Sequence, residues 1–340
     1  MKRFSCACGN PVFYENTFCT SCGARLGFDP ARLTLVAVQQ TPQGNWQDSA
    51  GSLYDLCRNT LQHDNCNWLN AAGDPDPYCV SCRLNRTIPN LDNPENRQRW
   101  RSIENAKRRL LFTFLQFGLD VLSKTRGWPH GLAFDFIEDT TPLHGESGRV
   151  LTGHEHGIIT INVAEADDVV RTMTRKQMNE RYRTLLGHFR HESGHYYFPR
   201  LVNDGPQLDE YRRLFGDETL DYTSALDHYY SQGPAKDWPQ KHISAYASAH
   251  SAEDWAETWA HYLHMYDCLD TAAAYGLSDP PGGDFDQLLQ RWQDFSVVLN
   301  ELNRSMGMRD AYPFWIIEPV AQKLRFVDTV LNGVRSRAPL

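Results

Sequence analysis

The stretch that decides the fold spans residues 188–195 and reads His188-Phe189-Arg190-His191-Glu192-Ser193-Gly194-His195. It contains the pattern His-Glu-x-x-His. Side chains four residues apart on a helix lie on one face, so the imidazoles of His191 and His195 can hold one zinc ion. Glu192 follows the first histidine, where its carboxylate can reach a water molecule on that zinc. Neutral nitrogen donors beside a base predict a catalytic zinc site on a helix.

A zinc ion at such a site needs a third ligand from the protein. One class of zinc enzymes with His-Glu-x-x-His takes this third ligand from the histidine of a Gly-x-x-His extension after the motif. Here the positions of that glycine and that histidine hold Phe198 and Leu201. That class is excluded, and a glutamate from a second helix is expected instead. The distant segment 251–264 is the candidate.

Four polar side chains form one stripe at helical spacing in that segment: Glu253, Glu257, His261 and His264. We assign Glu253 as the third ligand. Glu257, one turn further on, is placed to accept a hydrogen bond from a ligand histidine and so to fix its tautomer. His261 and His264 are expected around the site rather than on the metal. The alternative is a solvated acidic helix face.

Composition limits the possible partners. The chain has 340 residues, 41% of them hydrophobic, enough for one large domain and a small one. Its net charge of −8 does not favour a general grip on nucleic acid. No apolar run follows Lys2 and Arg3, and we find no stretch of about 18 apolar residues, so neither a secretory signal nor a membrane span is expected. We therefore expect a cytoplasmic protein.

Eight of the nine cysteines lie in the first 82 residues. In a reducing compartment such cysteines serve as zinc thiolates rather than disulfides. The first set is Cys6, Cys8, Cys19 and Cys22, two close pairs that are each followed by glycine. Because so few residues cannot bury a core, the metal would supply the folding energy of this zinc ribbon. We place the ribbon at residues 1–27.

The second set is Cys57, Cys66, Cys79 and Cys82. We interpret it as a second structural zinc site, within a module at residues 28–92. Two alternatives remain open: buried free thiols, or one composite module whose two sites exchange ligands. Both modules are candidates for docking a protein partner, because the basic and aromatic lining of a nucleic-acid surface is sparse.

The remaining residues, 93–340, predict an α+β domain, mostly helical with a small mixed sheet. Apolar spacing predicts a helix that starts near Pro94 and is weakened and ended by Gly118 and then Gly127, and alternation predicts strands at 132–137 and 158–163, the second preceded by a hairpin turn. Further helices are expected at 176–198, 285–302 and 313–331.

Gly194 predicts close packing against the metal site. The insert at 201–250 is expected to line one side of the cleft that contains the metal. His228 and Tyr229 within it are candidates to stabilise a negatively charged oxygen, the oxyanion, that forms on a substrate carbonyl.

These motifs resemble the glutamate zincins, particularly the lethal-factor-like group. In that group a helix carrying Glu-x-x-Ala-Glu supplies the metal ligand, as at Glu253 to Glu257 here. A tyrosine seven residues earlier assists at the oxyanion, which implies this role for Tyr246. The whole chain resembles bacterial zinc-binding metallopeptidases with an N-terminal zinc ribbon. The segments that carry this resemblance are 79–89, 182–192 and 255–262.

The expected function is hydrolysis of peptide bonds in a peptide or protein substrate, with Glu192 as general base and Tyr246 at the oxyanion. Three zinc ions are expected, one catalytic and two structural. The alternative is a zinc-stabilised adaptor with a latent or inactive peptidase fold. A nucleic-acid-binding ribbon protein is a third, weaker hypothesis.

Overall fold

The computed structural model describes residues 2–139, 148, 150–177 and 181–336. It divides into two compact units, Met1–Arg171 and Thr172–Leu340, whose boundary falls inside helix α3 (Asp168–Gln177). In the described part of the chain, no helix is both long enough and apolar enough to cross a bilayer.

Unit 1 begins with a minimal hairpin, β1 (Phe4–Ser5) against β2 (Pro11–Val12). The cysteine turns that follow β1 and β2 place Gly9 at φ +86° and Gly23 at φ +73°. Only glycine adopts this backbone region without strain, so the two glycines allow the chain to turn tightly at the sulfur atoms.

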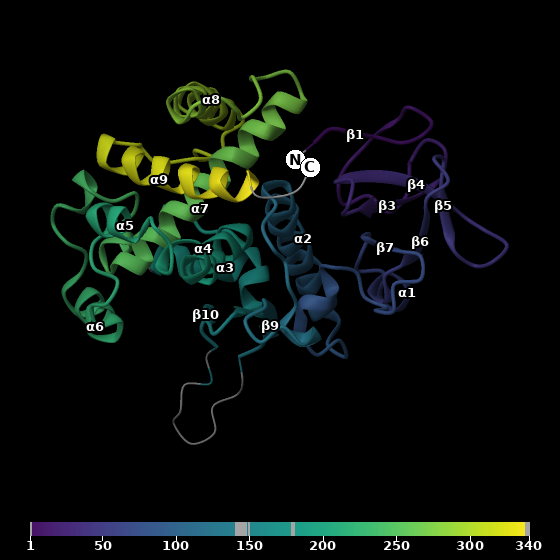
Figure 1. Cartoon of the computed structure of the whole chain (residues 1–340), viewed down its shortest axis with the longest axis horizontal. Helices are drawn as coiled ribbons and strands as arrows, with labels where there is room; N and C mark the ends of the chain where they lie inside the picture. The colour runs from purple at the N-terminus through teal and green to yellow at the C-terminus, as the bar shows by residue number, and fades with distance from the viewer. Residues whose placement is uncertain (1, 140–147, 149, 178–180, 337–340) are drawn as a thin grey trace. The chain divides into compact units, whose positions relative to one another are not determined.

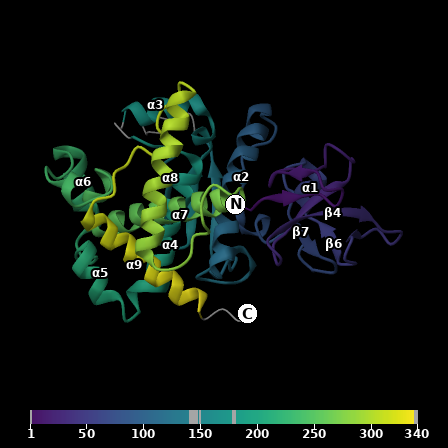
Figure 2. The same cartoon turned by 90° about the horizontal axis from the view of Figure 1, so that it is seen from above.

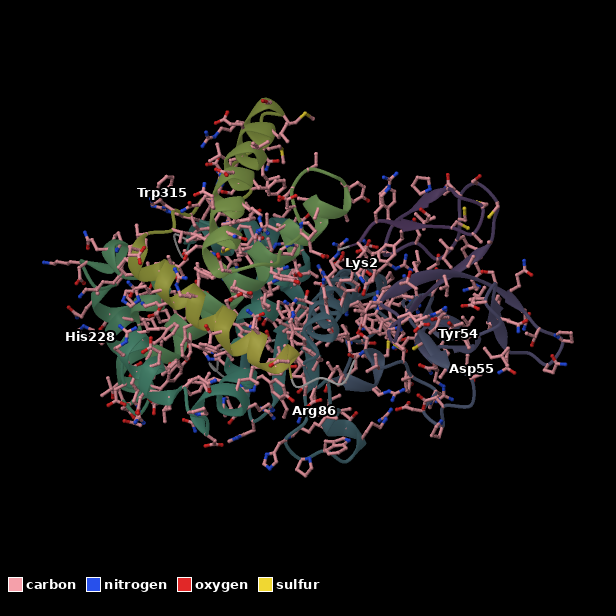
Figure 3. All side chains as sticks on the ribbon, turned by 45° about the horizontal axis from the view of Figure 1, so that its top comes forward. Lys2, Tyr54, Asp55, Arg86, His228 and Trp315 are labelled. Atoms are coloured by element: carbon pink, nitrogen blue, oxygen red, sulfur yellow. The ribbon has the colours of Figure 1, made fainter. Side chains whose placement is uncertain are left out.

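A five-stranded antiparallel meander follows, in the order β3-β4-β5-β6-β7. Its strands are β3 (Arg25–Asp29), β4 (Thr34–Gln40), β5 (Trp46–Asp48), β6 (Leu53–Leu56) and β7 (Leu69–Ala71). Val38, Tyr54 and Leu69 form its core, and the short helix α1 (Arg58–His63) connects β6 to β7. Neighbouring residues of a strand point to opposite faces, and on β6 Tyr54 is buried whereas Asp55, labelled beside it in Figure 3, is partly exposed. The sequence analysis did not anticipate this sheet.

The second sheet of unit 1 is mixed, in the order β10-β11-β9-β8. Its strands are β8 (Asn85–Thr87), β9 (Ala133–Ile137), β10 (Gly153–Glu155) and β11 (Ile158–Asn162). Strands β8, β9 and β11 pair in parallel, whereas β10 and β11 form the expected hairpin. Helix α2 (Pro94–Phe117) starts near Pro94, as predicted, after a cap at Asn93, and it ends at Gly118, the first of the two glycines expected to weaken and end it.

Unit 2 is helical. Its elements are α4 (Leu185–Phe198), the π-helical turn η4 (Pro199–Asn203), α5 (Leu208–Phe215), α6 (Tyr222–Gln232), η5 (Trp238–Gln240), η6 (Tyr246–Ser248), α7 (Ser251–Ala274), α8 (Phe285–Ser305) and α9 (Glu318–Arg335). Helices α4 and α7 lie side by side in both views (Figures 1 and 2). The α+β prediction, helical with small mixed sheets after a cysteine-rich start, is confirmed.

The close packing of α4 on α7 depends on Gly194. A Cβ atom at this position would lie 2.9 Å from the Ala256 Cα, closer than such contacts allow. The indole of Trp255 donates to the Gly194 carbonyl at 2.9 Å, and the indole of Trp259 donates to the Ser193 hydroxyl at 3.1 Å. These contacts hold α7 against the part of α4 that carries the His-Glu-x-x-His motif.

Two helix boundaries differ from the prediction. The single helix expected at 176–198 is wrong, because residues 181–184 are not helical and α4 begins only at Leu185. The Thr184 side chain accepts from the Gly187 amide at 2.9 Å and so caps a new helix there. Residues 178–180 lie outside the described part. The last helix starts at Glu318, not 313, because Pro319 occupies its first turn.

Candidate functional site

Three side chains converge where α4 meets the first turn of α7. The Nε2 atoms of His191 and His195 lie 3.2 Å apart. Glu253 Oε2 lies 3.0 Å from His191 Nε2, and Glu253 Oε1 lies 3.5 Å from His195 Nε2. The structure thus brings together the three residues that the sequence analysis assigned to one metal, with ligand atoms within 4.8 Å of one another.

Local structure explains the position of Glu253. His250 caps α7: its Nδ1 accepts from the Ala252 amide at 3.1 Å, while its Nε2 donates to the Leu220 carbonyl at 3.1 Å. Glu253 therefore sits in the first turn of α7, where the helix dipole favours a negative charge. Its side chain is fully buried.

The donor set fits a cation. His191 Nδ1 donates to Glu257 Oε1 at 2.7 Å, so its Nε2 carries a lone pair toward Glu253. Glu253 Oε2 is buried and finds no hydrogen-bond donor among the described residues. A tetrahedral zinc ion, with bonds of about 2.0–2.1 Å to nitrogen, separates two such nitrogens by about 3.3 Å. The observed distance of 3.2 Å between the two Nε2 atoms is therefore close to the distance that one zinc ion requires.

The electrostatics agree with this interpretation. Burial lowers the pKa of His191, but the carboxylates of Glu253 and Glu257 outweigh it and hold that pKa well above its usual value. Burial raises the pKa of Glu253, and the two imidazoles outweigh this and hold it well below the usual range. The two pKa shifts reflect one mutual interaction: the carboxylates favour the charged imidazole of His191, and the imidazoles favour the charged carboxylate of Glu253.

Glu192, the expected base, lies beside the cluster and is 8% exposed. Burial raises its pKa, and the charges of His191 and His195 only partly oppose this effect. A carboxyl group with a raised pKa is a better proton acceptor than a solvated one.

Glu257 takes the position expected of it and has a second partner. Its Oε2 accepts from the Ser244 hydroxyl at 2.7 Å, and the Ser244 oxygen accepts from the Ala247 amide at 3.1 Å. Ser244 thus connects Glu257 to η6, the turn that carries Tyr246. Ser244 was not predicted, since nothing in its local sequence pattern distinguishes it.

Two tyrosines border the cluster. The ring of Tyr246 lies 5.9 Å from the His191 ring, centroid to centroid, and burial raises its pKa. The hydroxyl of Tyr222, on α6, donates to Glu253 Oε1 at 2.5 Å. Tyr222 was also missed, because it lies 31 residues before Glu253 in a segment without periodicity. Of the other candidates on α6, Tyr229 packs its ring against Tyr246 at 5.7 Å and His228 is exposed (Figure 3).

The histidines further along α7 lie away from the metal ligands. His261 Nδ1 bonds the Tyr312 hydroxyl at 2.8 Å, and burial lowers its pKa to about 4. His264 Nδ1 lies 3.2 Å from Arg190 Nη1, beside the buried ion pair of Arg190 with Asp267. Through Arg190, His264 belongs to a polar network that joins α4 to α7, whereas His261 bonds to Tyr312.

The eight N-terminal cysteines form two separate clusters, each with sulfurs within 4.8 Å of one another. Cys6 and Cys22 are 3.7 Å apart, as are Cys8 and Cys19, and Cys66 and Cys79 are 3.6 Å apart. Zinc–sulfur bonds of about 2.3 Å give a tetrahedron with edges of about 3.8 Å. The clusters fit one zinc ion each, and the composite arrangement with exchanged ligands is not what the structure shows.

Comparison with known proteins gives consistent results. Residues 96–330 match the family described as "Putative zinc-binding metallo-peptidase", and residues 3–93 match a zinc-ribbon domain. Uncharacterised proteins of Mycobacterium bovis and Mycobacterium tuberculosis are 40% identical over 346 aligned residues, covering 98% of this chain and 96% of theirs. No solved structure matches the chain. The chain therefore belongs to this family of zinc-binding metallopeptidases, with a zinc-ribbon domain at its N-terminus.

Proposed function

We propose that the chain is a zinc-dependent peptidase of the gluzincin type, whose catalytic zinc is held by His191, His195 and Glu253. The observation that carries the proposal is the convergence of two half-buried histidines and one buried glutamate, with a second carboxylate, Glu192, beside them but outside the donor set. When bound, zinc supplies Lewis acidity, which lowers the pKa of a water molecule to about 7 and polarises a carbonyl group.

Side chains of the protein transfer the proton, stabilise the oxyanion and orient His191. A Glu192 carboxylate oxygen accepts the proton of the attacking water and later delivers it to the leaving amine. Tyr246 donates its hydroxyl hydrogen to the oxyanion that develops on the substrate carbonyl. Glu257 keeps the proton of His191 on Nδ1, so that Nε2 stays available as a donor. The substrate is a peptide or protein.

The N-terminal cysteines complete the proposal. Each four-cysteine cluster holds one structural zinc, which gives three zinc ions per chain. We propose a ribbon at 1–27, a second cysteine module at 28–92 and a peptidase domain at 93–340, with the ribbons as docking elements for a protein partner. Thiolates that are kept reduced for zinc suit the cytoplasm.

The test is hydrolysis of a peptide library by the full chain, compared with Glu192→Gln. The wild type is expected to cleave and to stop when the metal is chelated. Glu192→Gln is expected to keep its zinc and lose about 10⁴ in kcat/KM, because the proton acceptor is gone. Equal cleavage by both proteins would overturn the mechanism. Full zinc loading without any cleavage by the wild type would instead favour the adaptor.

A further inference from the structure

Glu253 is held by a second side chain that the proposed mechanism does not use. Tyr222 donates its hydroxyl hydrogen to Glu253 Oε1 at 2.5 Å. The other oxygen, Oε2, is buried without a donor among the described residues and lies 3.0 Å from His191 Nε2. The two oxygens of one carboxylate therefore differ: Oε1 accepts a hydroxyl hydrogen, and Oε2 faces the imidazole nitrogen of His191.

This difference matters for the number of bonds that Glu253 can make. A carboxylate with both oxygens free can bind a metal through one oxygen or through both. A hydrogen bond to one oxygen reduces its donor strength toward a cation and fixes the plane of the group. Catalytic zinc sites keep one position for water or substrate beside three ligands from the protein. A glutamate bound through both oxygens would crowd that position.

We propose that Tyr222 is a positioning residue, which makes Glu253 a ligand through Oε2 alone and so keeps one position on the metal open to substrate. This inference rests on the proposed function, because it assumes a metal at the His191, His195 and Glu253 cluster. Tyr222 acts through Glu253, and its hydroxyl also lies beside the hydroxyl of Tyr246.

The position of Tyr222 argues against a purely structural role. No side chain of α6, all of whose residues are described, is buried, and the Tyr222 residue is itself 42% exposed. Its ring contacts His250 edge-on, at 5.3 Å between centroids. Removing one hydroxyl from such a residue leaves its ring contact in place and opens no cavity in the core. The hydroxyl nevertheless reaches a fully buried carboxylate.

The test replaces zinc by cobalt in the full chain and compares wild type, Tyr222→Phe, His195→Ala and Tyr230→Phe. Cobalt absorbs visible light more strongly with four ligands than with five. Subtracting the His195→Ala spectrum removes the contribution of the cysteine clusters. Tyr230→Phe is the matched control, since it makes the same change on the same helix at a residue that is 62% exposed.

Tyr222→Phe is expected to retain the site metal, to show a weaker cobalt difference spectrum, and to lose about tenfold or more in kcat with little change in KM. Tyr230→Phe is expected to match the wild type in all three respects. A Tyr222→Phe difference spectrum identical to that of the wild type would overturn the inference. Loss of the site metal in Tyr222→Phe would also overturn it, because a freed oxygen should add a donor.

Failure of the proposed function is recognised separately. If the wild type and His195→Ala give the same cobalt spectrum, the site holds no metal, and the proposed function and this inference both fail. If the spectra change as expected but the wild type cleaves no peptide, the inference on Glu253 is supported and the peptidase assignment is wrong.

Discussion

The cysteine clusters of unit 1 and the His-Glu cluster of unit 2 are built on opposite plans. Each cysteine cluster offers four identical sulfur donors, which complete a tetrahedron. The cluster of unit 2 offers three donors, two imidazoles and one carboxylate, and has an unused acid, Glu192, next to it. A complete set of protein ligands is typical of structural zinc sites, whereas three ligands with an open position are typical of catalytic ones.

The two cysteine clusters also differ from each other. Cys57, Cys66, Cys79 and Cys82 are all buried, and backbone amides donate to three of their sulfurs, among them Trp68 N to Cys66 Sγ at 3.4 Å. The buried guanidinium of Arg108, bonded to the Asn65 carbonyl at 3.0 Å, adds positive charge near Cys66. In the first cluster, Cys8 and Cys22 are exposed. Solvent can replace a lost ligand only in the exposed cluster.

The largest effect should come from removing a ligand of the buried cluster. Cys79→Ser is expected to destabilise unit 1 by several kcal/mol, a large part of the about 5–15 kcal/mol that stabilises a typical domain. Cys22→Ser should cost much less, because water can fill the exposed position. Thermal unfolding and zinc content of both variants measure the difference. Equal destabilisation would show that exposure does not distinguish the clusters.

The next effect concerns the cluster of His191, His195 and Glu253 in unit 2. Tyr246→Phe is expected to keep all zinc and the same unfolding temperature, but to lose about 10²–10³ in kcat, the usual cost of removing one donor to an oxyanion. Steady-state kinetics on a cleaved peptide measure the loss. An unchanged kcat would exclude Tyr246 from the reaction, whatever the zinc content.

A smaller effect is expected from the outer partner of His191. Glu257→Gln keeps an acceptor near Nδ1 but removes its negative charge, so metal affinity or activity should fall by about 10–100-fold. Zinc competition with a chelator measures the affinity at the site. If the affinity and kcat of Glu257→Gln match those of the wild type, the bond from His191 to Glu257 does not tune the metal.

The sequence predicted the parts of the site that local periodicity encodes. His191, Glu192 and His195 share one helical turn, and Glu253 with Glu257 share another, so spacing alone identified both faces. Tyr222 and Ser244 contact Glu253 and Glu257 from segments that precede α7, and no spacing within those segments reveals this.

Among the secondary-structure elements, too, those with a clear local signal were predicted and the others were missed. Helix α2 was predicted from its apolar spacing, with a start near Pro94 and Gly118 as the first residue to weaken it, because these signals are local. The meander at 25–71 was missed, because its three-residue strands β5 and β7 are too short for alternation to be recognised. The break before Leu185 was also missed, since the Thr184 cap stands inside an otherwise helical apolar pattern.

The central claim is that α4 and α7 together hold one metal ion, separate from the two that the cysteines hold. Elemental analysis of the purified full chain and of Glu253→Ala tests this directly. We expect three zinc ions per chain in the wild type and two in Glu253→Ala, with unit 1 unchanged. Three zinc ions retained in Glu253→Ala would contradict the account, because the carboxylate that joins the two helices would then not be a ligand.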